Sequence, residues 1–293
     1  MVEILNGSLV AADLCTVVKA NVEKLQKESG VTPGLAAVLV GNNPASDVYV
    51  RRKLAKSREV GIRAFEHRLD AGTTEEELFS LIAKLNADPD VHGILVQLPL
   101  PEQIRSEKIL GAIDPEKDVD GFHPVNVGRL SSGGLVPCTP LGCMLLLEQV
   151  IKDFRGLKAV VIGKSNIVGK PVALLLLERE CTVTVTHIHT RSLASIVASA
   201  DIIVVAAGHP GLVRGGWVKD GAVVIDVGIN RIVGADGKPR IVGDVRADEM
   251  GHAGILTPVP GGVGPMTIAC LLANTVKACA SLLEVSEDDS GAP

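Results

Sequence analysis

Apolar residues in this chain form short strand-like runs that alternate with longer segments in which apolar positions recur every three or four residues. The short runs predict strands at residues 34–40, 93–96, 158–162, 182–186, 201–206 and 222–227. The longer segments predict helices at residues 9–28, 46–60, 73–85, 141–152 and 266–283. Strands and helices in this order are typical of parallel sheets that helices cover on both faces.

A loop-rich stretch, residues 112–140, interrupts this alternation and contains the sequences DPEKDVDG, SSGG and PCTP. A chain of 293 residues suggests about two domains. We therefore predict two α/β domains, one of residues 1–138 and 267–293 and the other of residues 139–266, with a Rossmann-like parallel sheet in the second. The closing helix is expected to pack back on the N-terminal domain.

The composition narrows the class of protein. Hydrophobic residues make up 46% of the chain but aromatic ones only 2%, so valine, isoleucine, leucine and alanine must fill the cores. The net charge of -5 and the lack of a long basic run argue against nucleic acid as a partner. No apolar stretch is expected to approach the ~20 residues that span a bilayer, and the N-terminal segment lacks the basic start of a secretory signal. We therefore expect a cytoplasmic protein without a membrane partner, whose six scattered cysteines are free thiols.

The sequence TPVPGGVGPMT, residues 257–267, holds three prolines and three glycines. Proline fixes φ, whereas glycine permits positive φ and lets a ligand approach the backbone closely. We therefore predict a rigid loop that shapes a ligand site, followed by the closing helix. An ordinary turn between two elements is the alternative.

A second glycine-rich segment, VVIGKSNIVGKP at residues 160–171, predicts a strand, a tight turn and the start of a helix. Such a turn aims helix N–H groups at a pyrophosphate, although Ser165 replaces the middle glycine of the GxGxxG pattern and an ordinary βα turn remains the alternative. The candidate cofactor-binding residues of this turn are Gly163, Lys164, Ser165, Ile167, Val168 and Gly169.

The end of the next predicted strand indicates which dinucleotide would bind. An NAD site carries Asp or Glu about 20 residues after the glycine turn, but this strand ends in His187-Ile188-His189-Thr190-Arg191. The cationic neighbourhood favours the 2′-phosphate of NADP, with NAD as a poorer cofactor. His187, Ile188 and Thr190 are further cofactor candidates. The HxH pair also fits a metal site, but no third ligand is apparent and we expect no metal.

The first half of the chain carries reactive side chains. Tyr49, the only tyrosine, and Lys53 are four residues apart on a predicted helix and so share one face. A tyrosine can stack on a planar ligand, and a lysine among apolar neighbours can transfer protons, although a lone pair of this spacing is usually just a surface feature. Gln97 follows the apolar strand 93–96, at the edge where open α/β sheets bind ligands.

The sequence KDVDGFH, residues 117–123, places two carboxylates in a glycine turn. Asp120 is the candidate for orienting a lysine or for holding an amino-substituted ring. An Asx turn or a calcium-like loop is the alternative, but the segment lacks the spaced ligands and terminal Glu of an EF-hand. His123 is expected to be structural.

Together these segments resemble one family. The resemblance is carried, over about residues 3–283, by YVRRK (49–53), GILVQLPLP (93–101), KDVDGFHPVNVGRL (117–130), PCTP (137–140), GKSNIVGKP (163–171), VIDVGIN (224–230), VGDV (242–245) and TPVPGGVGPMT (257–267). In this order they look like the bifunctional methylenetetrahydrofolate dehydrogenase/methenyltetrahydrofolate cyclohydrolases. The resemblance implies oxidation of 5,10-methylenetetrahydrofolate with NADP, hydrolysis of the product to 10-formyltetrahydrofolate in the same cleft, and a homodimer joined through its cofactor domains.

The resemblance also implies roles for individual residues. Lys53 matches the lysine that handles protons in the hydrolysis, Gln97 the glutamine that positions it, Tyr49 the tyrosine that stacks along the folate, and Asp120 the aspartate that grips the pterin. Residues 1–138 with 267–293 would then bind folate, and residues 139–266 would bind NADP. The remaining implied contacts are Val96, Leu98, Pro260, Gly261, Gly262 and Val263 with the folate, and Ser165, Thr190 and Ile229 with the cofactor.

Two residues depart from the family pattern. Lys164 stands where many relatives have arginine, and Ile188 stands where relatives often place serine or a basic residue. We therefore expect weaker discrimination between NADP and NAD. Three alternatives remain: an NADP oxidoreductase of the shikimate-dehydrogenase type, a monofunctional relative, and a folate- or dinucleotide-binding scaffold without turnover.

Overall fold

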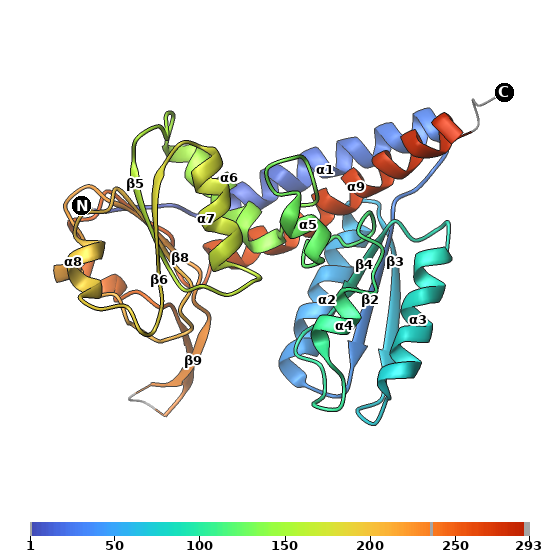
Figure 1. Ribbon diagram of the computed structural model, residues 1–293, viewed down its shortest axis with the longest axis horizontal. Coiled ribbons are helices and arrows are strands. Elements are labelled where there is room, and N and C mark those ends of the chain that lie inside the picture. Colours follow the sequence, from blue (N-terminus) through green and yellow to red (C-terminus); the bar gives the residue numbers. More distant parts are fainter. Residues whose placement is uncertain (1, 235–236, 290–293) are drawn as a thin grey trace. The chain divides into compact units, whose positions relative to one another are not determined.

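The structure is a computed structural model that describes residues 2–234 and 237–289 (Figure 1). The chain forms two compact units. The six-stranded unit comprises the residues up to Ala12 together with Thr139–Thr267, and the three-stranded unit comprises Asp13–Cys138 together with the residues from Ile268 onward. The N-terminal residues correct the sequence prediction, which assigned all of residues 1–138 to one domain. They lie in the six-stranded unit because β1 (Glu3–Ile4) pairs in parallel with β11 (Ile255–Leu256).

The six-stranded unit contains a wholly parallel sheet with the strand order β1-β11-β8-β7-β5-β6. Its other strands are β5 (Lys158–Ile162), β6 (Thr182–Thr186), β7 (Ile202–Val205) and β8 (Val223–Asp226). Its helices are α6 (Cys138–Val150), α7 (Gly169–Glu178) and α8 (Leu193–Val197), with 3₁₀ turns η1 (Gly215–Trp217) and η2 (Ala247–Glu249). β9 (Asn230–Val233) and β10 (Pro239–Val242) form an antiparallel hairpin beside it.

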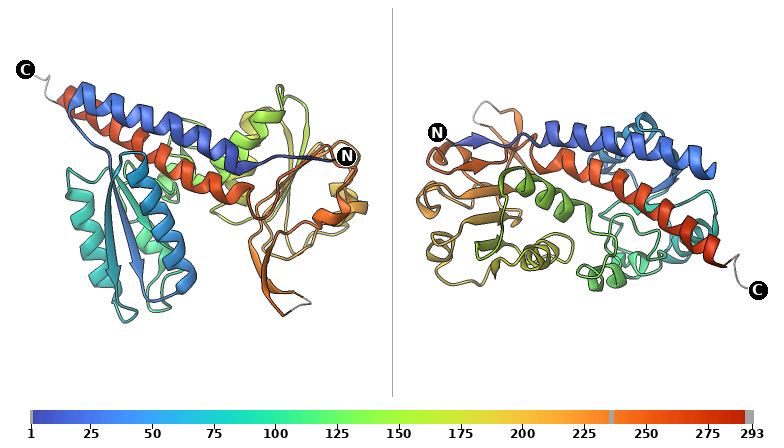
Figure 2. Two further views of the ribbon diagram at one scale, coloured as in Figure 1. Left: turned by 180° about the vertical axis from the view of Figure 1, so that it is seen from behind. Right: turned by 90° about the horizontal axis from the view of Figure 1, so that it is seen from above.

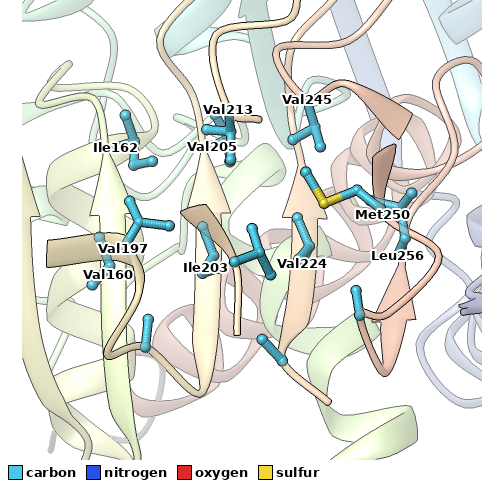
Figure 3. Packing of buried hydrophobic residues seen from close by; sticks show 14 residues of the cluster. Val160, Ile162, Val197, Ile203, Val205, Val213, Val224, Val245, Met250 and Leu256 are labelled. Carbon is cyan, nitrogen blue, oxygen red and sulfur yellow. The ribbon is translucent and has the colours of Figure 1, made fainter. Parts of the chain in front are cut away.

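The chain leaves β5 for β6 on one side and then returns to β7 on the other side of β5. Right-handed crossovers in opposite directions place α7 and α8 on opposite faces of the sheet (Figure 1). On one face, Val160, Ile203 and Val224 from neighbouring strands pack with Val197 of α8 (Figure 3). β5 and β7 are apolar on both faces, which explains why the sequence predicts them, whereas the two-residue strands β1 and β11 are too short to give a pattern and were not predicted.

The three-stranded unit contains a parallel sheet of β2 (Gly34–Val40), β3 (Arg63–Leu69) and β4 (Gly93–Val96) in the order β3-β2-β4. Its helices are α2 (Pro44–Glu59), α3 (Glu75–Ala87), α4 (Ser106–Leu110) and α5 (Pro124–Gly128), together with α1 (Gly7–Ser29) from Asp13 onward and α9 (Val263–Asp289) from Ile268 onward. β3 was not predicted from the sequence. Its RAFEHRL sequence mixes polar and apolar residues without regular alternation and stays partly exposed, so it has neither the period of a half-buried strand nor the continuous apolar run of the central strand.

α9 and α1 lie side by side in this unit (Figure 2). Val263–Glu284 is long and apolar enough to cross a membrane by length and composition alone, so the expectation that no stretch approaches that length was wrong. In its most apolar window, however, 56% is buried inside the protein, and Leu271 and Leu272 are fully buried. Length and composition do not distinguish a membrane span from a core helix.

Local signals position the helix that carries the first candidate residues. Asn43 caps α2, because its side-chain oxygen accepts the N–H groups of Ala45 at 2.9 Å and Ser46 at 3.2 Å. Pro44 occupies the first turn, where its missing N–H costs no helical hydrogen bond. These signals fix the start of α2 at Pro44 and thereby the position of Lys53 along the helix.

Candidate active site

Lys53 and Gln97 meet in the three-stranded unit. Lys53 lies on α2 with only 8% of its surface exposed, and its Nζ donates to Gln97 Oε1 at 3.3 Å. Gln97 follows the last residue of β4, and its Nε2 donates to the carbonyl of Leu98 at 2.7 Å. That bond fixes which end of the amide faces the lysine, because Nε2 is committed to the backbone and Oε1 is left to accept. A buried ammonium thus faces an oriented acceptor.

Asp120 is the carboxylate whose charge bears on this lysine. It is 8% exposed, and burial raises its pKa, while the positive charge of Lys53 works in the opposite direction. Beside it, burial holds the pKa of the Cys138 thiol well above its usual range, and Cys138 Sγ donates to the carbonyl of Val119 at 3.2 Å. A carboxyl group in such an environment can exist in the protonated form and can hydrogen-bond to a neutral amino-substituted ring.

The turn that presents Asp120 is held by residues outside the predicted set. Asn274 of α9, which is 3% exposed, donates to the carbonyls of Val119 at 2.9 Å and Val136 at 2.8 Å. Asp118 accepts the His123 N–H at 2.8 Å and the Asn126 Nδ2 at 3.0 Å, and burial raises its pKa. Asn274 could not be identified from the sequence, because its partners are 155 and 138 residues away along the chain.

The remaining candidate residues of this unit differ in how exposed they are. Tyr49 is one helical turn before Lys53 and 37% exposed, so its ring is available to a ligand. Val96 is buried as the last residue of β4, whereas Leu98 is half-buried. His123 is structural, as expected, since its Nδ1 accepts the Val125 N–H at 3.1 Å at the start of α5.

The glycine turn of the six-stranded unit packs closely against neighbouring backbone. Gly163 has φ of 119°, and a Cβ there would lie 2.2 Å from the carbonyl oxygen of Ala206, while a Cβ at Gly169 would lie 2.1 Å from the oxygen of Gly163. Ser165 Oγ accepts the N–H groups of Val168 at 3.2 Å and Gly169 at 3.3 Å, at the entrance of α7. Serine at the middle position of the motif therefore closes the turn by hydrogen bonding.

The segment after β6 forms a compact turn. The His187 N–H donates to Thr190 Oγ1 at 2.8 Å, and the Thr190 N–H donates to the His187 carbonyl at 2.8 Å. Ile188 projects into solvent with 91% of its surface exposed. Lys164 and Ile167 of the preceding turn are exposed as well, so a ligand can reach them. Among the described residues, no group of three or more His, Cys, Asp or Glu side chains could hold a metal ion.

The proline- and glycine-rich segment is only partly a loop. α9 begins at Val263, so residues 263–265 are helical as well, which corrects the prediction that the closing helix begins at residue 266. Pro260 is exposed and Gly261 has φ of 102°. The Ser8 N–H donates to the Gly261 carbonyl at 3.1 Å. A Cβ at Gly7 would lie 2.0 Å from the Gly262 oxygen, a constraint that sequence reasoning missed.

The fold and these two sets of residues define a class of protein: a two-unit α/β protein with a dinucleotide-binding sheet in one unit and a buried lysine–amide pair in the other. The chain belongs to the tetrahydrofolate dehydrogenase/cyclohydrolase family. The family's catalytic-domain model matches residues 5–120, and its NAD(P)-binding-domain model matches residues 137–282.

Individual relatives agree with this assignment. The chain is 70% identical, over 95% of its length and 95% of the relative's, to Bifunctional protein FolD 1 of Rhizorhabdus wittichii. Its structure resembles that of the FolD methylenetetrahydrofolate dehydrogenase/cyclohydrolase of Campylobacter jejuni, with a TM-score of 0.92 and 48% identity over 96% of this chain and 100% of that one. It also resembles the Trypanosoma brucei FolD enzyme solved with NADP and an inhibitor. That comparison gives a TM-score of 0.91 and 40% sequence identity over 96% of this chain and 98% of the other.

The shikimate-dehydrogenase alternative is not favoured. A shikimate dehydrogenase solved with NADP+ shares 12% identity and a TM-score of 0.51 over 86% of this chain and 96% of that one. A likeness at this level reflects a common fold type and says nothing about the substrate.

Proposed function

We propose that this protein oxidises 5,10-methylenetetrahydrofolate with NADP and hydrolyses the resulting 5,10-methenyltetrahydrofolate to 10-formyltetrahydrofolate. The observation that carries the proposal is the buried Lys53–Gln97 pair, within the electrostatic influence of Asp120, in a chain of this family. The named relatives are bifunctional, which supports both steps and disfavours a monofunctional enzyme.

The six-stranded unit fits the cofactor. Gly163 and Gly169 let the turn pack closely against neighbouring backbone, and the turn lies at the N-terminus of α7, where the helix dipole favours an anion. When bound, NADP accepts a hydride from the substrate's methylene carbon. Lys164, Ser165, Ile167 and Val168 would contact the pyrophosphate region; His187, Ile188 and Thr190 would contact the adenosine end, and Ile229 the nicotinamide end.

The three-stranded unit supplies the folate contacts in this proposal. Tyr49 offers an exposed ring for stacking, and the Asp120 carboxyl would hold the pterin. Val96 and Leu98 flank Gln97 in this unit and would add apolar contacts. Hydride transfer then requires mainly orientation, because the adjacent nitrogens already activate the methylene group.

Hydrolysis requires proton movement as well as orientation. Water adds to the methenyl carbon and loses a proton, and one carbon–nitrogen bond then breaks to leave the formyl group on N10 and a proton on N5. Lys53 is positioned to accept and return protons, and Gln97 holds its Nζ through a single oriented oxygen. General acid–base assistance of this kind is typically worth about 10²–10⁴-fold.

We further propose a cytoplasmic homodimer joined through the six-stranded units. Ile232, Val233 and Ile241 on the β9–β10 hairpin are 36%, 75% and 42% exposed, an apolar surface that a second copy could cover. Sedimentation equilibrium tests this: a mass of twice 30.6 kDa is expected, and a monomer at micromolar concentration would contradict it.

A direct assay tests the function. Purified protein is mixed with 5,10-methylenetetrahydrofolate and either NADP or NAD, the reduced nicotinamide is followed by absorbance, and 10-formyltetrahydrofolate is then measured. We expect reduction with NADP, slower reduction with NAD, and formyl product in both. No reduction with either cofactor would instead support a binding scaffold.

A further inference from the structure

Two buried aspartates at the carboxyl edge of the six-stranded sheet have no part in the chemistry described so far. Asp226 ends β8 and is 4% exposed, and Asp244 follows β10 and is 0% exposed. Each faces the glycine of the other's motif. A Cβ at Gly228 would lie 2.3 Å from Asp244 Oδ1, and a Cβ at Gly243 would lie 1.8 Å from Asp226 Oδ2. The sequences VIDVG and VGDV therefore fit together reciprocally.

Asp226 ties the two motifs together through backbone groups. Its Oδ1 accepts the N–H groups of Gly228 and Asp244, each at 2.9 Å, and its Oδ2 accepts the Val245 N–H at 3.0 Å. Both carboxylate oxygens are thus occupied by donors that are part of the chain itself. Hydrogen bonds from backbone N–H groups to a charged acceptor are short and strong.

Asp244 reaches two other segments. Its Oδ2 accepts the N–H groups of Ala207 and Gly208, each at 2.8 Å, and its Oδ1 accepts Asn230 Nδ2 at 2.7 Å. Ala207 and Gly208 follow β7, and Asn230 follows β8 and begins β9. A single carboxylate therefore joins the loops that leave two adjacent strands.

The loop after β7, which Asp244 binds, lies where a sheet of this type binds its ligand. The strand order reverses between β5 and β7, and open α/β sheets bind their ligands in the crevice at such a switch point, beside the loops that follow the two strands. The loop after β5 is the Gly163 turn, which is in close contact with Ala206. Asp244 binds the loop after β7 at Ala207 and Gly208, the two residues that follow Ala206. Through Asn230 it also binds the segment that contains Ile229.

The carboxylates of Asp226 and Asp244 are stabilised mainly by hydrogen bonds from backbone N–H groups. Among the ion pairs of the residues that the structure describes, none includes Asp226 or Asp244. Lysine or arginine partners could swing aside, whereas backbone donors cannot move without moving the loop. A carboxylate satisfied in this way sets the conformation of the loop.

We propose that Asp244 is a positioning residue for the hydride-transfer step, and that Asp226 holds Asp244 in place. The inference rests on the proposed function and goes beyond it by identifying what fixes the loops on the nicotinamide side of the cofactor site. Asp244 acts on the cofactor through Ala207, Gly208 and Asn230, without touching it.

The geometry allows a pair of variants with opposite expectations. Asp244→Ala removes the acceptor for both loop N–H groups, and we expect kcat/KM for NADP to fall at least tenfold. Asp244→Asn retains one carbonyl oxygen, which suffices because Ala207 and Gly208 share a single oxygen of the aspartate. Its NH2 group then faces Asn230, whose own amide can turn its oxygen toward it. We expect Asp244→Asn to keep dehydrogenase activity within about threefold.

A second activity of the same protein separates positioning from general damage. Hydrolysis of supplied 5,10-methenyltetrahydrofolate relies on Lys53 and Gln97, and we expect Asp244→Ala to retain it within twofold. The matched control is Asp201→Ala. Asp201 also accepts a backbone N–H, that of Lys158 at 2.7 Å, but it precedes β7 at the opposite edge of the sheet. We expect the control to leave both activities within twofold.

The outcomes are distinguishable. Loss of the NADP step in Asp244→Ala, with hydrolysis intact and rescue by Asp244→Asn, would establish the proposal. Equal loss of both activities, unchanged NADP kinetics, or an equal loss in Asp201→Ala would overturn it while leaving the proposed function in place. If the unmodified protein reduces neither NADP nor NAD, the proposed function fails and this inference fails with it.

Discussion

Replacing Lys53 by methionine isolates the hydrolytic step. Methionine is close to lysine in length and volume, so the substitution leaves no large cavity in a side chain that is 8% exposed. It removes the ammonium group and the hydrogen bond to Gln97 at 3.3 Å. The lost bond costs about 1 kcal/mol, and relief from burying a charge offsets part of that cost. We therefore expect the free energy of unfolding to change by no more than about 1 kcal/mol.

The effect on hydrolysis should be much larger. If Lys53 is the general acid–base group, its loss slows the cyclohydrolase step by about 10²–10⁴-fold, which corresponds to about 3–5 kcal/mol of barrier. The assay follows the disappearance of 5,10-methenyltetrahydrofolate by absorbance, and NADP binding is measured separately by titration. We expect NADP affinity to remain within twofold, because the cofactor candidates belong to the other unit.

A matched control lies on the same helix. Lys56→Met removes a lysine three residues further along α2 that forms an ion pair with Glu59 at 2.7 Å, and it should leave both activities unchanged. Hydrolysis within tenfold of normal in folded Lys53→Met would refute the role of this lysine. Loss of NADP binding in the same variant would refute the division of roles between the units.

Three further predictions concern the six-stranded unit. Gly163→Ala places a side chain at a φ of 119° and 2.2 Å from a carbonyl oxygen, so we expect a loss of about 1–3 kcal/mol in stability, measured by chemical denaturation, and at least a tenfold weaker NADP affinity. Ile188→Arg adds a cation at a position that is 91% exposed and should raise the NADP preference over NAD by about tenfold, about 1.4 kcal/mol in relative kcat/KM; an unchanged ratio would place the 2′-phosphate elsewhere. Burial raises the pKa of Asp226 from 3.8 to about 6, so the folded state binds the carboxyl proton more tightly than the unfolded chain does. The contribution of Asp226 to the free energy of unfolding therefore falls by up to about 3 kcal/mol as the pH rises from about 4 to about 6. Denaturation of Asp226→Asn across this range should lack that decline, and identical slopes in the two proteins would contradict the assignment.

The sequence predicts those parts of the fold whose signal is local. β5 and β7 are apolar on both faces, and the Gly163 turn stands between a strand and a helix, so each can be recognised from a few neighbouring residues. β3 was missed because its RAFEHRL sequence has neither a regular alternation nor a continuous apolar run. The helical start of α9 was missed because Gly264 and Pro265 suggest a loop, although proline is tolerated in the first turn of a helix.

Contacts between distant segments were beyond sequence reasoning. The pairing of Glu3 with Ile255 moves the N-terminal residues into the six-stranded unit, and nothing near Glu3 in the sequence indicates it. Asn274 hydrogen-bonds to Val119, beside Asp120, although the two residues are 155 positions apart in the sequence. Asp226 and Asp244 are likewise brought together only by the β9–β10 hairpin between them. Motif matching located Lys53, Gln97 and Asp120, but the residues that fix their surroundings become visible only when the chain is folded.

The central claim is that one protein performs both steps, and the stoichiometry of its products tests that claim most directly. A limiting amount of 5,10-methylenetetrahydrofolate is converted with excess NADP, and NADPH and 10-formyltetrahydrofolate are quantified in the same sample. We expect equal amounts of NADPH and 10-formyltetrahydrofolate, formed faster than 5,10-methenyltetrahydrofolate hydrolyses without the protein. NADPH accompanied by accumulated methenyl product, hydrolysed only at the uncatalysed rate, would contradict it.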